Sequence, residues 1–233
     1  MKVNKLALVG KACLASVVLG TTIISSIPTE AVSFSPPGKP APGQTYGGAS
    51  RDGACFTEDN YIEYKSLWPS QEIGLTIAGH PTLFAYIPQT SAQQVLLSIK
   101  DEADNLHYRQ YLPLKAHGGV VGVQIPQNAP PLQLEKNYRW SLQIVCNQDD
   151  PDHPETFGWI RRVPMDARLA SGKVQPSVEQ VSWLAQAGIW CETLSTLASL
   201  RQAEPENQTL RANWQELLTS VGLEDLATQP LKD

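Results

Sequence analysis

The sequence is poor in positive charge. Its 233 residues include 18 Lys and Arg against 23 Asp and Glu, which gives a net charge of −5, and no run of basic residues interrupts this balance. A surface with an excess of negative charge repels phosphate backbones and anionic lipids. We therefore expect no nucleic acid among the partners of this chain.

Long apolar runs are lacking beyond the N-terminus, so no later segment is expected to span a membrane. Residues 1–31 follow the order of a signal peptide, with a basic segment, an apolar run over residues 12–27 and small residues at the exit. Six Ser, Thr and Gly residues make the apolar run too polar, and slightly too short, for a membrane span. We expect cleavage after Ala31. A cut a few residues away and an uncleaved anchor are the alternatives.

Cleavage at this point removes three Lys and one Glu, so the mature chain carries a net charge of about −7. We expect a soluble, extracytoplasmic protein, in the periplasm or secreted into the medium. Lipid attachment at Cys13 is not expected, because Cys13 follows Lys11 and Ala12, where a lipoprotein signal has small and aliphatic residues.

Cysteine is scarce, with four residues in the whole chain, of which Cys55, Cys146 and Cys191 follow the predicted cleavage site. Two of them can pair in an oxidising compartment. Because Cys55 and Cys146 lie in β-rich sequence, we predict a Cys55–Cys146 disulfide, which by loop closure would stabilise the fold by at most about 4–5 kcal/mol. Cys191 lies in a helical pattern and is expected to be a free, half-buried thiol that packs as a small hydrophobe. A nucleophilic role for Cys191 is the alternative.

Large apolar side chains are scarce in residues 32–52, which are rich in Pro, Gly and Ser, and we expect a flexible linker there. Residues 53–165 contain short β-rich segments separated by turn residues, without helical periodicity. We predict strands over residues 82–87, 95–100, 106–112, 119–125, 138–146 and 157–163. The polar residues 101–105 are predicted to close a hairpin.

The number and spacing of these strands predict an antiparallel β-sandwich. Leu132, followed by Tyr138 and Trp140, matches a tyrosine corner, in which a Tyr hydroxyl ties a late strand to the preceding crossover. An immunoglobulin domain has its second cysteine two residues after this Tyr, whereas Cys146 comes eight residues after Tyr138. We therefore predict an Ig-like sandwich of the fibronectin III kind, with its disulfide at one end.

Residues 166–233 change to helical periodicity, and we predict a small C-terminal helical domain. Pro176 and Ser177 mark the start of a helix over residues 177–187, a second helix follows Gly188, and Asn207 caps a third. Gly188, Trp190, Leu197, Leu200 and Pro205 resemble the second half of a tetratricopeptide unit. One such unit cannot bury its apolar face alone, so it must pack on the sandwich or on another chain.

Several short motifs occur together in the mature chain: Gly53-Ala54-Cys55, Ala129-Pro130-Pro131-Leu132, Tyr138-Arg139-Trp140-Ser141, Gly158-Trp159-Ile160 and Ala187-Gly188-Ile189-Trp190. In this combination they resemble the bacterial domain-of-unknown-function family number 928, over nearly the whole mature chain. The resemblance implies an exported bacterial protein with strands first and helices after them. It implies no activity and no functional residue.

Catalytic motifs are missing from the sequence, which has no Gly-x-Ser-x-Gly elbow, phosphate loop or dinucleotide fingerprint. The four histidines, His80, His107, His117 and His153, show no metal-ligand spacing. The acidic segment 149–155 could hold a hard cation such as calcium, but it has no Gly for a sharp turn, and we interpret it as a solvated loop. We predict no catalytic, cofactor-binding or metal-binding residues and no cofactor.

These observations favour a non-enzymatic protein-binding or assembly module of the cell envelope, in which the sandwich is the scaffold and the helical unit faces another envelope protein. A carbohydrate- or polymer-binding module is the first alternative, and exposed aromatic side chains such as Trp68 or Tyr61 on a sheet face would favour it. A hydrolytic enzyme is the second alternative, which converging carboxylates in a cleft would favour. The oligomeric state and the ligand are left open by the sequence.

Overall fold

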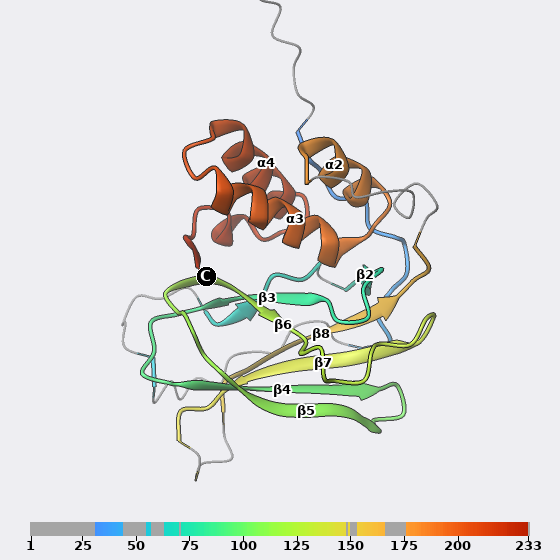
Figure 1. Cartoon of the computed structure of the whole chain (residues 1–233), viewed down its shortest axis with the longest axis vertical. Coiled ribbons are helices and arrows are strands. Elements are labelled where there is room, and N and C mark those ends of the chain that lie inside the picture. The colour runs from blue at the N-terminus through green and yellow to red at the C-terminus, as the bar shows by residue number, and fades with distance from the viewer. Residues whose placement is uncertain are drawn as a thin grey trace, which may run out of the picture. The chain divides into compact units, whose positions relative to one another are not determined.

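The computed structural model describes residues 31–43, 55–56, 63–69, 71–147, 149, 153–165 and 176–232. These residues form nine strands in two sheets, three α-helices and one short 3-10 helix (Figure 1). The strands are β1 (Lys65–Ser66), β2 (Gly74–Thr76), β3 (Thr82–Ile87), β4 (Gln94–Asp101), β5 (Leu106–Pro113), β6 (Gly119–Gln124), β7 (Asn137–Ile144), β8 (Glu155–Arg162) and β9 (Leu231–Lys232). The helices are α2 (Val178–Gln186), α3 (Trp190–Ala203) and α4 (Gln208–Thr219), followed by η1 (Glu224–Leu226).

The two sheets have the strand orders β1-β3-β6-β9 and β2-β8-β7-β4-β5. Long neighbouring strands pair antiparallel, as expected from the sequence. The expected antiparallel arrangement fails at two sheet edges, where β2 pairs parallel with β8 and β9 pairs parallel with β6. These two strands have three and two residues, and each joins a strand that is distant in the sequence.

The six strands predicted from the sequence are present, with ends shifted by at most two residues. Pro81 and Pro88 border β3 on both sides, because proline cannot donate to a strand ladder. The β4–β5 hairpin closes over Asp101, whose carboxylate accepts hydrogen bonds from the backbone N–H groups of Ala103 and Asn105, both at 3.0 Å. The local signals in the sequence therefore placed the long strands correctly.

The inner faces of both sheets contribute to one hydrophobic core. Along β7 every second side chain is fully buried: Tyr138, Trp140, Leu142 and Ile144. The Tyr138 hydroxyl accepts a hydrogen bond from the backbone N–H of Gln133 at 3.4 Å. The predicted tie between this strand and the preceding crossover is therefore present.

The helices begin at their predicted caps and pack on the sheets. The Ser177 side chain accepts a hydrogen bond from the N–H of Gln180, and the Asn207 side chain accepts two from the first turn of α4. At the start of α3 the Trp190 indole is fully buried, and its N–H donates to the backbone oxygen of Leu67 at 2.9 Å. No helix in the described part of the chain is long and apolar enough to cross a membrane.

The N-terminal segment 32–43 also packs on this fold. Val32 and Phe34 are 1% and 5% exposed, and the Phe34 ring lies edge-on to Trp190 with ring centroids 4.7 Å apart. The backbone N–H of Ser35 donates to the oxygen of Ala185 at 3.1 Å. The flexible linker predicted over residues 32–52 is therefore wrong for residues 32–43, because two apolar side chains and the backbone find partners on the helices. Residues 44–52 lie outside the described residues.

The cysteines have the arrangement predicted from the sequence. Cys55 and Cys146 form a disulfide that closes a loop with a sequence separation of 91 residues. Cys191 is free and fully buried, where the sequence indicated a half-buried thiol. It is more deeply buried than expected because α3 lies between the sheets and the other two helices (Figure 1).

Candidate functional site

Exposed large apolar side chains mark surfaces that can bind a partner. Among the described residues four such side chains are exposed: Leu106, Tyr111, Leu134 and Met165. Leu106 and Tyr111, which are 59% and 53% exposed, both lie on β5, and none of the four lies on a helix. The helical unit, where we expected the partner surface, thus offers no exposed apolar side chain of this kind within its described residues.

Strand β5 lies at the edge of its sheet. It pairs with β4 on one side, and the described residues place no strand on its other side. Such an edge leaves backbone N–H and C=O groups free to pair with another chain. The register of β4 and β5 shifts between Ile99 and Lys100, and Pro113 ends β5. Because a bulge and a proline both limit strand pairing, the part of the edge that suits pairing runs over residues 109–112.

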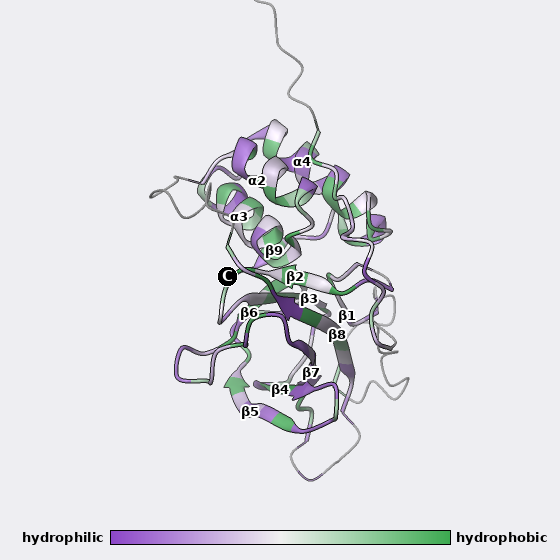
Figure 2. Ribbon diagram, turned by 90° about the vertical axis from the view of Figure 1, so that its right-hand side faces the viewer, coloured by the Kyte–Doolittle hydropathy of each residue, from purple (hydrophilic) through white to green (hydrophobic). Residues whose placement is uncertain are grey.

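An apolar cleft with a volume of about 490 Å³ lies between β5 and β6, and we name it the β5 cleft. Both sheets line it, through Thr82, Val95, Leu112, Pro113, Leu114, Lys115, Val121, Gly122, Val123 and Gln124. Figure 2 shows β5 and β6 along the same side of the molecule, each in a different sheet. Because β9 pairs only with Val120 and Val121, the rest of β6 has no strand on this side in the described part of the chain. The free edge of β5 and an apolar cleft therefore adjoin each other.

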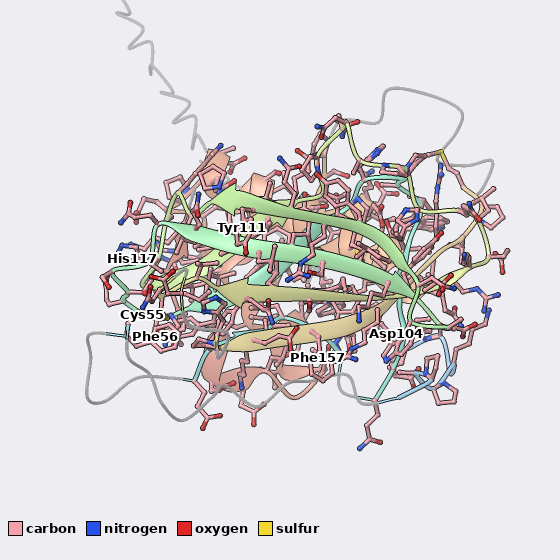
Figure 3. All side chains as sticks on the ribbon, turned by 90° about the horizontal axis from the view of Figure 1, so that it is seen from below. Cys55, Phe56, Asp104, Tyr111, His117 and Phe157 are labelled. Atoms are coloured by element: carbon pink, nitrogen blue, oxygen red, sulfur yellow. A yellow bond between two sulfur atoms is a disulfide. The ribbon has the colours of Figure 1, made fainter. Side chains whose placement is uncertain are left out.

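The outer side of the five-stranded sheet is a second exposed surface, which we name the open sheet face (Figure 3). The strand register places its side chains in three rows across β5, β4, β7 and β8. The middle row consists of Arg109, Ser98, Ser141 and Phe157, and the flanking rows consist of Tyr111, Leu96, Gln143 and Glu155 and of Leu106, Lys100, Arg139 and Trp159. Leu96 and Trp159 in the flanking rows are buried, so the exposed part of this face is formed by the other side chains. Tyr111 on β5 and Phe157 on β8 lie on opposite sides of this face (Figure 3).

A partly buried polar cluster joins α3 to the residues around β2. The Glu192 Oε1 atom accepts hydrogen bonds from the Thr76 hydroxyl at 2.7 Å and from the backbone N–H groups of Ile77 and Ala78 at 3.2 and 3.1 Å. Burial raises the pKa of the Glu192 carboxyl, although these hydrogen bonds lower it in part. Burial also raises the pKa of the neighbouring Cys191 thiol, which opposes formation of the nucleophilic thiolate. This cluster is suited to holding α3 in place.

The aromatic residues proposed from the sequence for sugar binding do not form a platform. Trp68 is 4% exposed, and its indole N–H donates to the backbone oxygen of Trp159 at 3.2 Å. The burial of Trp68, whose ring fills the core beside Gly74, where a side chain would overlap it, therefore counts against Trp68 as a sugar-binding residue. Tyr61 lies outside the described residues. The exposed aromatic that the sequence reasoning missed is Tyr111, and the alternation along residues 106–112 was the available signal.

Three of the four histidines have hydrogen-bond partners outside any group of metal ligands. His80 and His107 contact backbone oxygens of the crossover before β7, and His117 contacts the Gln89 side chain. Within the described ranges, no group of three or more His, Cys, Asp and Glu side chains is arranged to hold a metal ion. Residues 150–152, in the middle of the acidic loop, fall outside those ranges, so the interpretation of this loop stays a prediction.

Comparison with known proteins identifies a family but no activity. No curated protein and no solved structure matches the chain. A protein family does match, over residues 46–231, a range that contains the β5 cleft, the open sheet face and the Glu192 cluster. This match confirms the resemblance seen in the sequence. The chain belongs to the family described as Domain of Unknown Function (DUF928).

Proposed function

We propose that the chain is a non-enzymatic binding module of the cell envelope, which accepts an extended segment of another envelope protein at the β5 edge. The observation that carries this proposal is the position of a free strand edge beside an apolar cleft of about 490 Å³. A segment that adds to a strand edge forms main-chain hydrogen bonds, and alternate side chains point to the same face. Every second side chain of the added segment would then face the β5 cleft, between Leu112 and Val123.

The lining of the cleft defines the chemistry of this partner. Most of its side chains are aliphatic, and Lys115 supplies a positive charge. The segment should therefore carry aliphatic residues at alternate positions, whose burial contributes about 25 cal/mol per Å² of apolar area. An acidic residue beside them would pair with Lys115. Because Lys115 is exposed, this pair contributes more to the choice of partner than to affinity.

The proposal also includes the type of sandwich, the type of helical unit and the route of export. The common core of the two sheets and the contact between Tyr138 and Gln133 support a sandwich of the fibronectin III kind. The packing of α2 on α3 supports a tetratricopeptide-like unit. The Cys55–Cys146 disulfide supports export through a signal peptide over residues 1–31, because disulfides persist in oxidising compartments. In this arrangement the sandwich, and not the helical unit, provides the partner surface.

Site-specific photo-crosslinking in intact cells tests the proposal. A photoreactive amino acid replaces Gln110, which is exposed on β5, or in a matched control Glu216, which is exposed on α4. We expect a discrete cross-linked protein from position 110 and none from position 216. A synthetic peptide of the cross-linked segment should then slow amide hydrogen exchange of residues 109–112.

Two substitutions separate the cleft from a general surface effect. Val123→Arg places a charge in the β5 cleft, and Lys115→Glu reverses the charge at its lining without changing a buried residue. Both should abolish or strongly reduce the cross-link at position 110, while the thermal unfolding midpoint of Lys115→Glu stays that of the wild type. The proposal is wrong if position 216 captures the same protein as efficiently, or if both variants cross-link like the wild type.

A further inference from the structure

We infer that the open sheet face binds an anionic polysaccharide, independently of the β5 cleft. The face lies on the outer side of the five-stranded sheet, whereas the cleft lies between the sheets. In the middle row the two central positions carry the small side chains of Ser98 and Ser141, with Arg109 and Phe157 at the ends. Neighbouring strands lie about 4.8 Å apart, so the two ends of this row are about 14 Å apart. The row is therefore lower in the middle, where the side chains are short, than at its two ends, where they are long.

Positive charge is concentrated on this face of an acidic protein. Lys100 on β4 lies directly opposite Arg139 on β7, and Arg109 lies nearby on β5. Like charges directly opposite each other destabilise a sheet. Lys100 has a counter-charge in Asp104 at 3.0 Å, but the ion pairs among the described residues include neither Arg109 nor Arg139. A bound anion would relieve this repulsion.

The uncharged groups of the face match the chemistry of a sugar chain. The hydroxyls of Ser98 and Ser141 and the amide of Gln143 can both donate hydrogen bonds to sugar hydroxyls and accept hydrogen bonds from them. The exposed Tyr111 ring offers an apolar plane at one side of the face. The Arg139 guanidinium stacks on the Phe157 ring, 4.4 Å from its centroid, which holds both side chains in position.

The remaining charge of the protein limits how densely charged the ligand can be. A net charge of −5 for the whole chain repels a polymer with a phosphate on every nucleotide. A polysaccharide with carboxylates on its sugar rings carries less charge per unit length, and screening over about 8–10 Å lets nearby Lys and Arg side chains dominate. Glu155 lies beside Gln143 on this face. Because its negative charge repels the carboxylates of the polysaccharide, it would direct them toward Lys100 and Arg139.

Isothermal titration of the purified mature chain with polygalacturonate tests this inference, with dextran as a neutral polymer and duplex DNA as a phosphate polymer. We expect binding to polygalacturonate that weakens when the ionic strength is raised from about 0.05 M to about 0.3 M. The double variant Arg109→Gln/Arg139→Gln should bind about tenfold more weakly, since each exposed charge contributes modestly. Absence of polygalacturonate binding, or equal binding of dextran or DNA, would overturn the inference.

A matched double variant controls for net charge. Lys232→Gln/Arg211→Gln removes two positive charges on β9 and α4, outside the five-stranded sheet, and should bind polygalacturonate like the wild type. An equal loss in this control would mean that net charge alone sets the affinity, and the inference would fail. Val123→Arg, which blocks the β5 cleft, should leave polysaccharide binding unchanged. The proposed protein partner and the inferred polysaccharide can therefore fail separately.

Discussion

The contact between Glu192 and the residues around β2 is a sharply testable interaction between the helices and the sheets. Glu192 lies in the first turn of α3, and its Oε1 atom receives hydrogen bonds from the Thr76 hydroxyl and from the backbone N–H groups of Ile77 and Ala78. Its Oε2 atom is shielded from solvent and has no hydrogen-bond partner among the described residues. We predict that Glu192→Ala destabilises the protein strongly and that Glu192→Gln does so little.

The magnitudes follow from the number of donors left without an acceptor. Glu192→Ala leaves the backbone N–H of Ile77 and the Thr76 hydroxyl without an acceptor, whereas the N–H of Ala78 still donates to the Thr76 hydroxyl oxygen at 3.1 Å. Each buried unsatisfied donor costs about 1–3 kcal/mol. Because the Glu192 side chain is only half-buried, the lower end applies to each of the two donors, and we expect the free energy of unfolding to fall by about 2–3 kcal/mol. Glu192→Gln keeps an acceptor oxygen at the same place, so we expect a loss of about 1 kcal/mol or less at neutral pH.

The pH dependence has a defined sign. Burial raises the pKa of the Glu192 carboxyl above its ordinary value of 4.5, so the folded state holds this proton more tightly than the unfolded state. The contribution of this group is therefore greatest below the ordinary pKa and is lost as the pH rises through the folded pKa. Compared with Glu192→Gln, which does not titrate, the wild type should lose stability as the pH rises from the ordinary pKa of 4.5 through the raised pKa of the folded state.

Urea unfolding followed by tryptophan fluorescence at a series of pH values measures both effects. Glu216→Gln, on the exposed side of α4, is the matched control and should have the stability and the pH dependence of the wild type. Equal stability of Glu192→Ala and Glu192→Gln, or a difference between wild type and Glu192→Gln that does not change with pH, would contradict this role of Glu192.

Three further predictions concern the N-terminal segment and the cysteines. Phe34→Ala removes the ring that packs on Trp190 and should lower the free energy of unfolding by about 3–4 kcal/mol in urea titrations; an unchanged midpoint would mean that the segment contributes nothing to stability. Replacing Cys55 and Cys146 by Ser should cost at most about 4–5 kcal/mol by the same measurement, and no cost would contradict a native disulfide. Cys191 should resist iodoacetamide in the native protein and react after unfolding, as mass spectrometry would show, because burial raises the pKa of its thiol; rapid native labelling would contradict this.

The elements that the sequence predicted correctly are those with a signal inside a few consecutive residues. The prolines at both ends of β3, the alternation along β7 and the caps at Ser177 and Asn207 act on neighbouring backbone groups. Strands β1, β2 and β9 were missed because each has two or three residues and exists only through its pairing with a distant strand. Composition also misjudged residues 32–43, since Pro and Gly content does not show that Phe34 has a partner in Trp190.

The candidate surfaces were predicted less well than the fold. Trp68 was a candidate for a sugar-binding face only if it was exposed, but its ring fills the core, and exposure cannot be read from residue type alone. The β5 cleft depends on Leu112 and Val123, which come from different sheets, and the opposition of Lys100 and Arg139 depends on the register of β4 and β7. Neither juxtaposition can be predicted from a short stretch of sequence, because each joins residues that are distant in the chain.

The sequence by itself therefore determined the long strands, the helices, their caps and the Cys55–Cys146 pairing, because these follow from periodicity, turn chemistry and cysteine placement. Only the tertiary structure decided which strand became the free edge, which face of the five-stranded sheet stayed open, and that Glu192 accepts hydrogen bonds from the residues around β2. These features arise where segments distant in the chain meet. Contacts of that kind depend on how the sheets and helices pack, which no short stretch of sequence specifies.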